Sequence, residues 1–217
     1  MKATLWEQLI RQLQMRWDDL IAAFVQHIQL VCLSMAIAVA VGVPLGVLIS
    51  RVTSLRGGVL GTAGVLQTIP SLALLGFMIP LLGIGMPTAV AALFLYSLLP
   101  IIRNTYTGIR DVDKSVIEAA RGMGMTDLQI LIRVQFPLAL SVIMAGIRTA
   151  TVINVGTATL AAFIGAGGLG DFIFMGIARS IDALVLLGAI PAALLALLFD
   201  FVLGLLEKWT VPKGLKI

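Results

Sequence analysis

Two long runs of apolar residues constrain this chain more than any other feature of its sequence. Residues 28–49 and 183–206 contain almost no charged side chain, and each is longer than the roughly 20 residues that a helix needs to cross a hydrocarbon core. Over the whole chain, 59% of residues are hydrophobic and 12% are charged, whereas a soluble domain has about 25% charged residues. The chain is therefore predicted to be an all-α integral membrane protein.

We expect about five transmembrane helices, at residues 28–49, 59–81, 87–102, 138–164 and 183–206. The first and third connecting loops and the C-terminal tail hold ten basic residues, and the N-terminal segment and the other two loops hold four, with Arg148 left out as intramembrane. Basic residues concentrate in cytoplasmic loops. We therefore expect a multi-pass protein with its N-terminus outside and its C-terminus inside.

The sequence divides into three parts on this interpretation. Residues 1–27 have apolar residues at three- and four-residue spacing and include Trp6 and Trp17, which predicts an amphipathic helix at the membrane interface. A short helix packed on the bundle is the alternative, and His27 at its end is interpreted as interfacial. Residues 28–207 form the transmembrane domain, and residues 208–217 form a cytoplasmic tail.

Polar side chains and prolines interrupt two of the predicted spans. Gln67, Thr68 and Ser71 surround Pro70 in the second span, and the fourth span carries several polar residues, among them Asn154 and Thr157. Such breaks are tolerated where neighbouring helices or a wet cavity satisfy the backbone. As a group these residues predict a polar translocation pathway, while hydrogen bonding between packed helices remains the alternative for each of them singly.

Arg148 lies about ten residues into the fourth span, roughly 15 Å deep at 1.5 Å per residue. A charge at that depth is costly and should face the bundle interior or a cavity. Asp200 lies at a comparable depth from the inner end of the fifth span. We therefore hypothesise an ion pair between Arg148 and Asp200, and we count Arg148 among the predicted pathway residues.

The loop between the third and fourth spans predicts a charged element of two short helices. Ser115 and Glu118 have the spacing of a capping box at the start of a helix over residues 116–123. Gly124 then supplies the left-handed residue that ends many helices. Thr126 and Gln129 repeat the capping box, and Pro137 suits the opening of the fourth span. The element is expected to project into the cytoplasm, where it could dock on a partner.

This loop resembles a known motif. Glu118, Ala119 and Ala120 are followed after three residues by Gly124 and after nine more by a V-Q-F-P segment ending at Pro137. The pattern is similar to the EAA loop of binding-protein-dependent ABC importer permeases, with Val and Phe where the motif has Ile and Leu. Residues 66–85, 98–109 and 144–174 resemble the osmoprotectant branch of that family, the glycine betaine, carnitine and choline permeases. The resemblance covers roughly residues 28–215.

The resemblance implies a type I ABC importer fold in the cytoplasmic membrane of a prokaryote, with a coupling loop at residues 104–137. In that family the EAA helix docks in a groove of a separate cytoplasmic ATPase. Glu118, Ala119, Ala120, Gly124 and Pro137 would then form the coupling element, with Glu118 in contact with the ATPase and Gly124 shaping the turn. Alternatively, Glu118 chiefly caps its own helix, and one residue can serve both roles.

Other partners follow from the same resemblance. The chain has no G-x-x-x-x-G-K-[ST] phosphate loop, so ATP is expected to be bound by the partner subunit and no cofactor by this chain. The family works as pairs of permeases, either two copies or two related chains, with an external substrate-binding protein. The chain itself is not expected to be an enzyme, because no catalytic or metal-ligand constellation is evident.

Residues 165–170 read GAGGLG and match the dinucleotide pattern G-x-G-x-x-G. We do not interpret them as a nucleotide site, because they follow a membrane helix and not a strand. Gly165, Gly167, Gly168 and Gly170 would lie near the external mouth of the pathway in the family interpretation, or would form a tight turn packed on the next span. The basic residues form no patch with interleaved aromatics, so nucleic acid is not an expected partner.

Two alternatives remain open at this stage. The EAA loop indicates an ATPase partner but does not identify the solute. An importer for another small polar solute, such as an amino acid, therefore fits the same motif. A secondary transporter that works without ATP is the alternative from another class. It would be expected to show intramembrane acidic relays or inverted repeats, for which Asp200 is the one candidate.

Overall fold

The computed structural model describes residues 4–210, and within that range every regular element is helical. The elements in chain order are α1 (Leu5–Met15), α2 (Trp17–Arg51), α3 (Thr53–Thr68), α4 (Ser71–Leu82), α5 (Met86–Arg110), α6 (Lys114–Gly122), α7 (Asp127–Ile130), the π-helical η1 (Leu131–Gln135), α8 (Phe136–Ala158), the 3₁₀-helical η2 (Thr159–Ile164), α9 (Gly170–Arg179) and α10 (Asp182–Thr210). Most of the predicted tail at residues 208–217 lies outside the described residues.

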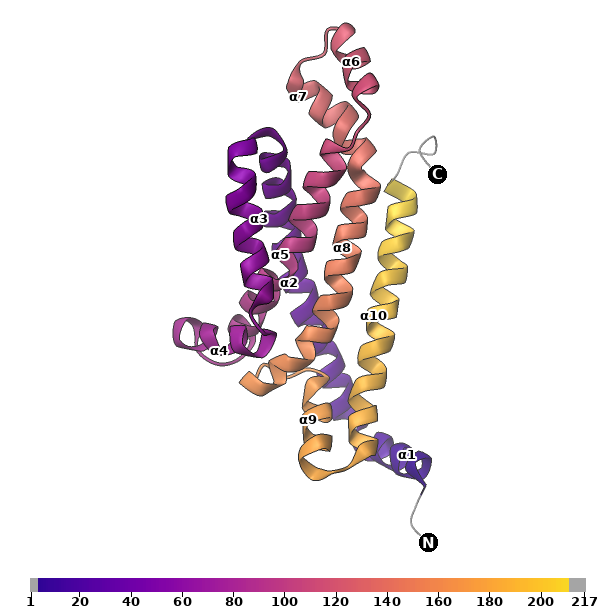
Figure 1. The fold of residues 1–217 in the computed structure, drawn as a ribbon. Coiled ribbons are helices and arrows are strands. Elements are labelled where there is room, and N and C mark those ends of the chain that lie inside the picture. Colours follow the sequence, from indigo (N-terminus) through magenta and orange to yellow (C-terminus); the bar gives the residue numbers. More distant parts are fainter. Residues whose placement is uncertain (1–3, 211–217) are drawn as a thin grey trace.

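The long helices α2, α5, α8 and α10 run side by side along the molecule (Figure 1). Helices α6 and α7 project beyond them at one end, which we call the α6 end, and α1 and α9 lie at the opposite end, which we call the α9 end. Four helical segments are long and apolar enough to cross a membrane, and the bent pair α3–α4 brings the number to five if it counts as one crossing. The all-α membrane fold with about five spans is confirmed.

The second predicted span, residues 59–81, is wrong as a single straight crossing. Helices α3 and α4 meet at an angle of 103°, and the break falls at Ile69 and Pro70, which have extended backbone conformations. Proline disfavours a helical conformation in the residue before it and cannot continue the hydrogen-bond ladder itself. Helix α4 therefore turns away from the bundle (Figure 1).

The predicted boundary at residue 27 also differs from the structure, because α2 runs without interruption from Trp17 to Arg51. Only α1 remains a separate N-terminal helix, and it begins with a capping box between Thr4 and Glu7. The apolar residues Leu9 and Leu13 pack against a cluster formed with α9 and α10. The alternative of a helix packed on the bundle therefore describes α1, although Trp6 and Met15 point outward with 68% and 67% exposure.

The core lies where α2, α5 and α8 meet, and small residues set the distances between these helices. A Cβ atom at Gly46 would come within 2.5 Å of Thr105, and one at Gly146 within 2.5 Å of Asn104. These glycines allow α5 to pack closely against both α2 and α8, as small residues do in membrane bundles. Large apolar side chains fill the rest of this core, among them Leu30, Leu93 and Ile101.

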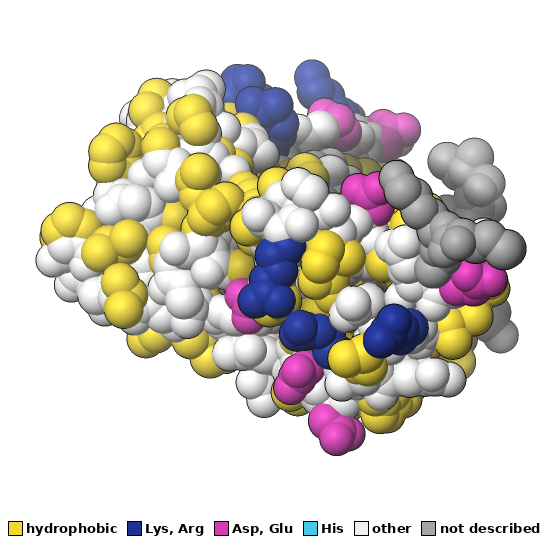
Figure 2. All heavy atoms as spheres, turned by 90° about the horizontal axis from the view of Figure 1, so that it is seen from below, with side chains coloured by type: hydrophobic (Ala, Val, Ile, Leu, Met, Phe, Trp, Pro, Cys, Tyr) yellow, Lys and Arg dark blue, Asp and Glu magenta, His cyan; other side chains and the backbone are white. Residues whose placement is uncertain are grey.

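The α9 end has a hydrophobic side and a charged side (Figure 2). Hydrophobic side chains gather over the lobe that contains α4, whereas the charged side chains lie away from it. Several large apolar residues of α4 and the turn after it are strongly exposed, namely Phe77 at 63%, Leu81 at 72% and Ile84 at 75%. This lobe therefore presents an apolar surface to whatever surrounds the chain.

Candidate functional site

The first helix of the projecting element is capped by Asp113 and not by Ser115. The Ser115 N–H donates to the Asp113 carboxylate over 2.8 Å, and α6 begins at Lys114. The predicted capping box of Ser115 and Glu118 is therefore wrong, because aspartate caps helices as well as serine does and precedes it in the chain. The same hydrogen bond, which favours the ionised carboxylate, lowers the pKa of Asp113 from its ordinary value.

Gly124 forms the corner of the element, as predicted. Its φ of 81° is left-handed. The Gly124 N–H donates to the Arg121 carbonyl over 3.0 Å, and the Met125 N–H donates to the Ala120 carbonyl over 3.2 Å, so two carbonyls at the end of α6 are satisfied. Nothing lies within 4 Å of the place where a Cβ atom of residue 124 would be, so only the backbone conformation requires glycine here.

The second capping box, formed by Thr126 and Gln129, is confirmed. The Gln129 N–H donates to the Thr126 hydroxyl, and the Thr126 N–H donates to the Gln129 side chain over 2.9 Å. Helix α7 then continues through η1 into α8, in which Pro137 is the second residue. Within η1 the helix widens, and the Phe136 N–H donates to the Leu131 carbonyl five residues earlier. This wider turn gives room to a proline ring that would clash in a regular helix.

The tip of the element is exposed and partly apolar. Glu118 and Ala119 are exposed, whereas Ala120 is buried beneath them. Apolar side chains are also exposed on the same element, namely Val116 at 40%, Met123 at 76%, Leu128 at 65% and Ile132 at 59%. Contiguous exposed apolar patches rimmed by polar residues can mark interaction sites, whereas single exposed apolar side chains are common. The projecting element therefore presents exposed apolar side chains beside the exposed Glu118.

Gln135 connects this element to the bundle, and sequence reasoning missed it. Its side chain is 8% exposed. Its Oε1 accepts a hydrogen bond from Arg51 at the end of α2, and its Nε2 donates to the carbonyl of Ile109 near the end of α5 over 3.3 Å. One side chain therefore joins three helices at the base of the projecting element. The sequence held one sign of this role, because Gln135 is a polar residue between the apolar residues at positions 134 and 136.

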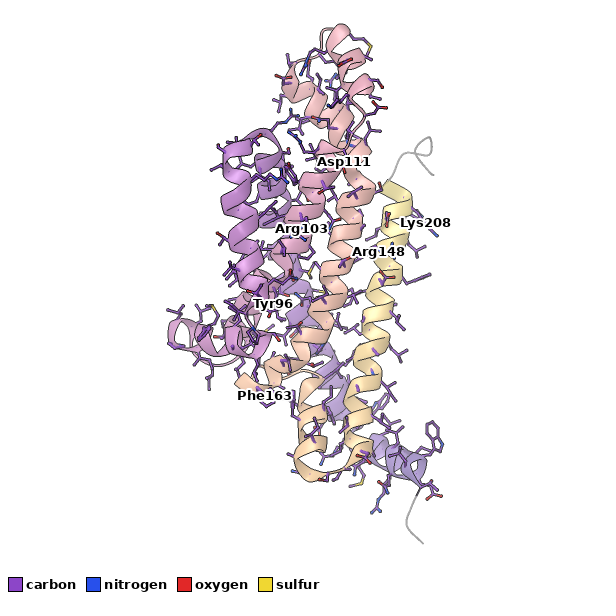
Figure 3. The ribbon with its side chains drawn as sticks, in the orientation of Figure 1. Tyr96, Arg103, Asp111, Arg148, Phe163 and Lys208 are labelled. Atoms are coloured by element: carbon purple, nitrogen blue, oxygen red, sulfur yellow. The ribbon has the colours of Figure 1, made fainter. Side chains whose placement is uncertain are left out.

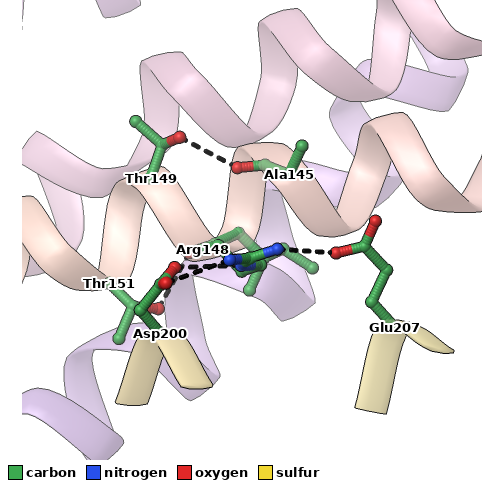
Figure 4. Close-up of polar contacts among 7 residues, drawn as sticks. Ala145, Arg148, Thr149, Thr151, Asp200 and Glu207 are labelled. Atoms are coloured by element: carbon green, nitrogen blue, oxygen red, sulfur yellow. Dashed lines mark hydrogen bonds and ion pairs between the residues drawn. The ribbon is translucent and has the colours of Figure 1, made fainter. Parts of the chain in front are cut away.

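The predicted ion pair between Arg148 and Asp200 is present. In Figure 3, Arg148 extends from α8 on the side next to α10. Its guanidinium donates to both carboxylate oxygens of Asp200, over 2.9 and 3.0 Å, and to Glu207 over 3.0 Å (Figure 4). Glu207 was missed, although it lies seven residues after Asp200 and therefore on the same face of a helix. Gly204 leaves space for the guanidinium, which lies 3.4 Å from the place of a Cβ atom there.

The ion cluster of Arg148, Asp200 and Glu207 is partly open on one side. The side chains of these three residues are 32%, 42% and 23% exposed. Two hollows of about 360 and 310 Å³ adjoin the cluster, and Thr149 lines the first of them. Because partly exposed charges at this depth are costly in lipid, this face must meet water or protein.

Asn154 does not face such an opening, which corrects its predicted place on a pathway. Its side chain is 2% exposed. Its amide donates to the Ser97 hydroxyl over 2.7 Å, and its Oδ1 accepts from the Ser34 hydroxyl over 3.2 Å. Asn154 therefore joins α2, α5 and α8 inside the bundle. Thr157, one turn further along α8, is partly exposed.

The other predicted pathway residues surround the break between α3 and α4. Thr68 and Pro70 are exposed there, and Gln67 and Ser71 are partly exposed. The hydroxyl of Tyr96 on α5 donates to the carbonyl of Ile69 at this break. Figure 3 shows that Tyr96 lies next to the break and that Arg148 lies nearer to the α6 end. The structure therefore places the predicted pathway residues at two levels of the bundle.

The glycine-rich turn at residues 165–170 lies at the α9 end and is tightly packed. Gly165, Gly167 and Gly168 have left-handed φ values of 69°, 74° and 90°. A Cβ atom at Gly167 would overlap the side chain of Gln26, and one at Gly170 would overlap the carbonyl of Thr159. The expectation of a tight turn packed on neighbouring helices describes these residues, and within residues 4–210 no strand precedes them.

His27 holds this turn, which corrects its interpretation as an interfacial residue. Its side chain is fully buried. The Leu169 N–H donates to its Nδ1 over 3.4 Å, so the other ring nitrogen, Nε2, carries the proton and donates to the carbonyl of Val155 over 3.1 Å. Among residues 4–210, His27 is not part of any group of three residues that could hold a metal ion.

Comparison with known proteins gives consistent results. Residues 38–212 match the family described as binding-protein-dependent transport system inner membrane component. The chain is 44% identical to the glycine betaine/carnitine/choline transport system permease protein OpuCB of Bacillus subtilis, over 96% of both chains. It is 50% identical to the carnitine transport permease protein OpuCB of Listeria monocytogenes, over 88% of both. It is 49% identical to the osmoprotectant import permease protein OsmW of Salmonella typhimurium, over 88% of this chain and 91% of that one.

Solved structures share the fold at lower sequence identity. The inward-facing MetNI methionine ABC transporter has a chain with a TM-score of 0.80 and 23% identity, over 92% of this chain and 99% of that one. An amino acid ABC transporter with histidines has one with a TM-score of 0.76 and 20% identity, over 96% and 99%. At these identities the likeness shows the fold, which is that of type I ABC importer permeases.

Proposed function

The chain belongs to the family of binding-protein-dependent transport system inner membrane components, and we propose that it is the permease subunit of an ATP-driven importer of osmoprotectants such as glycine betaine, carnitine and choline. The observation that carries this proposal is the 44 to 50% identity, over most of the chain, to relatives whose names specify these solutes. The common chemistry of the three solutes is a quaternary ammonium group on a small polar molecule.

The projecting element at the α6 end is the surface that meets the ATPase in this proposal. The support is its shape and its surface: a capped helix, a left-handed glycine corner and a second capped helix, with exposed apolar side chains around Glu118. ATP is bound and hydrolysed by the partner, and the rearrangement reaches the spans through α7, which is continuous with α8, and through Gln135, which touches the ends of α2 and α5.

The same proposal fixes the orientation of the chain. The α6 end faces the cytoplasm, since the ends of α2 and α5 there carry Arg51 and Arg110 and the projecting element adds further basic residues. The N-terminus and the glycine turn at residues 165–170 then face outward. An external substrate-binding protein delivers the solute at that end, where the glycine turn lies near the mouth of the pathway.

A second permease, either a copy or a related chain, completes the passage. The spans of one chain of this size can line only one side of a passage. The ion cluster on α8 and α10 also needs water or protein on its open side. We assign to the pathway the exposed or partly exposed residues Gln67, Thr68, Pro70, Ser71, Arg148 and Thr157. Asn154 is left out, because it is bonded inside the bundle.

Reconstitution tests this function directly. The chain is inserted into vesicles with its candidate ATPase and binding protein, and ATP hydrolysis and uptake are measured with glycine betaine, carnitine, choline and two amino acids. We expect stimulation by the quaternary ammonium solutes alone. Stimulation by an amino acid alone would favour the alternative of an ABC importer for amino acids. Uptake that survives ATP depletion while ion gradients are maintained would favour a secondary transporter and contradict the proposal.

A further inference from the structure

A hollow of about 290 Å³ lies at the α6 end, between the projecting element and the ends of the spans. Its lining comes from the end of α2, the end of α5, both helices of the projecting element and η1. Four of the lining residues are basic, namely Arg51, Arg110, Lys114 and Arg121, and Asp127 is the one acidic residue among them. The lining therefore carries a formal charge of +3, that is, four positive charges less one negative charge.

The acidic side chains within residues 4–210 leave most of this positive charge uncompensated. Asp127 pairs with Arg121 over 3.2 Å, and both side chains are more than half exposed, so the pair is weak. Asp111 and Asp113 lie in the same connection but do not line the hollow. Within residues 4–210, neither Arg110 nor Lys114 forms an ion pair. Two cations therefore face the hollow together without a carboxylate of their own.

Helix stabilisation explains only some of these charges. Arg51, Arg110 and Arg121 lie in the last turns of their helices, where a positive charge interacts favourably with the helix dipole. Lys114 is different, because it is the first residue of α6, where a positive charge is unfavourable for the same reason. An anion in the hollow would offset this unfavourable charge.

The polar groups at the base of the hollow point to the same class of ligand. The Ser50 hydroxyl donates to the carbonyl of Val47, and the Gln135 amide is engaged with Arg51 and Ile109. The groups left to bind a ligand are thus the ammonium and guanidinium groups, which suit phosphate oxygens. The hollow also lies where α2 and α5 end, which is the level of lipid headgroups for helices that span a membrane.

We propose that this hollow binds a phosphate-bearing anion, either the phosphodiester of an anionic phospholipid or free phosphate. The bound phosphate joins α6 to the ends of α2 and α5, and so holds the coupling element in a fixed position against the spans. The inference goes beyond the transport function and does not depend on which solute is carried. It requires only that the α6 end lies at the membrane surface.

Binding measurements on the purified complex of the chain with its ATPase and binding protein test the proposal. The complex in neutral detergent is titrated with phosphatidylglycerol and, separately, with inorganic phosphate, and bound ligand is counted by native mass spectrometry. The test variant combines Arg110→Gln and Lys114→Gln. The matched control combines Arg133→Gln in η1 with Lys208→Gln, which Figure 3 labels near the α6 end. Both residues are exposed and do not line the hollow, so the control removes the same charge.

The expected result is a selective loss of affinity. Each basic group near an anionic headgroup contributes roughly a fivefold factor in affinity, so the test variant should bind about 25-fold more weakly, and the control should stay within about twofold of the unmodified complex. Binding of phosphatidylglycerol alone identifies the lipid as the source of the phosphate, and competition by inorganic phosphate identifies the free ion. Lys114→Gln alone, at an exposed position, keeps the test valid if the double variant misfolds, and should weaken binding about fivefold.

Three outcomes would overturn the proposal. Equal weakening in test and control variants would mean that diffuse surface charge attracts the anion. Unchanged binding in the test variant would place the anion elsewhere. Loss of the ATPase from the test complex with unchanged anion binding would show that an acidic surface of the partner, and not a phosphate, occupies the hollow.

Discussion

Gly124 at the α6 end and Gly167 at the α9 end both have left-handed backbones, with φ values of 81° and 74°. Around Gly124 there is open space within 4 Å, whereas a Cβ atom at Gly167 would overlap Gln26 from a distant part of the chain. The open turn depends on its own neighbours in sequence and leaves its surface exposed. The packed turn depends on α2 and fixes the position of α9. The same residue type therefore forms an exposed corner at one end and a tightly packed turn at the other.

The largest effect should appear when a methyl group is added to the packed turn. Gly170→Ala places a Cβ atom into the carbonyl of Thr159, and because backbone must move, we expect a loss of about 3 kcal/mol or more in the free energy of unfolding. Gly61→Ala on α3 is the control, since nothing lies within 4 Å there, and alanine favours a helix. Unfolding in mixed detergent and dodecyl sulfate measures both, and equal midpoints would contradict the packed turn.

The second test removes the side chain that holds the packed turn. His27→Ala leaves the buried Leu169 N–H and the Val155 carbonyl without their partner, which should cost about 2 kcal/mol. Gln26→Ala, at the neighbouring and less buried position, removes one hydrogen bond to Gly168 and should cost less than about 1 kcal/mol. The same denaturation midpoints measure both variants. A smaller loss for His27→Ala than for Gln26→Ala would show that the histidine does not hold the turn.

Local signals in the sequence were sufficient for the open turn. Thr126 and Gln129 are three residues apart, so their capping box could be recognised without knowledge of the fold, and Gly124 could be assigned to the corner. The first cap was assigned to the wrong residue because Asp113 competes with Ser115 for the same role, and sequence patterns do not rank the two. The apolar runs predicted the spans. The 103° bend at Pro70 could not be predicted from the local sequence, because it also depends on the surrounding helices.

Contacts between distant residues limited the prediction elsewhere. His27 is bonded to residues 128 and 142 positions away, and no periodicity in the sequence reports such a contact. Asn154 has the composition of a pathway residue, yet its partners on α2 and α5 place it inside the bundle. The ion pair of Arg148 and Asp200 could be predicted from the sequence, because a charge inside a membrane requires a partner. Charge thus carried long-range information that neutral polar residues did not.

The third test changes the open turn. Gly124→Asp should alter the free energy of unfolding by less than about 1 kcal/mol, because space is open there and aspartate tolerates the left-handed conformation. Uptake and solute-stimulated ATP hydrolysis should fall about tenfold or more, since an unpaired carboxylate would be brought into a docking surface. Gly124→Asn is the control of similar shape without the charge, and it should retain most activity. Normal uptake by Gly124→Asp would count against docking at this corner.

The smallest expected effect concerns the cap of α6. The hydrogen bond from Ser115 holds the pKa of Asp113 below its ordinary value, so ionised Asp113 stabilises the start of α6 at and above that ordinary value. This stabilisation is lost as the pH falls through the lowered pKa. Hydrogen exchange of residues 115–122, corrected for the intrinsic rate, should therefore accelerate with acidification. Asparagine also caps helices but does not titrate, so Asp113→Asn should flatten this dependence, and a profile identical to the unmodified chain would assign it to another group.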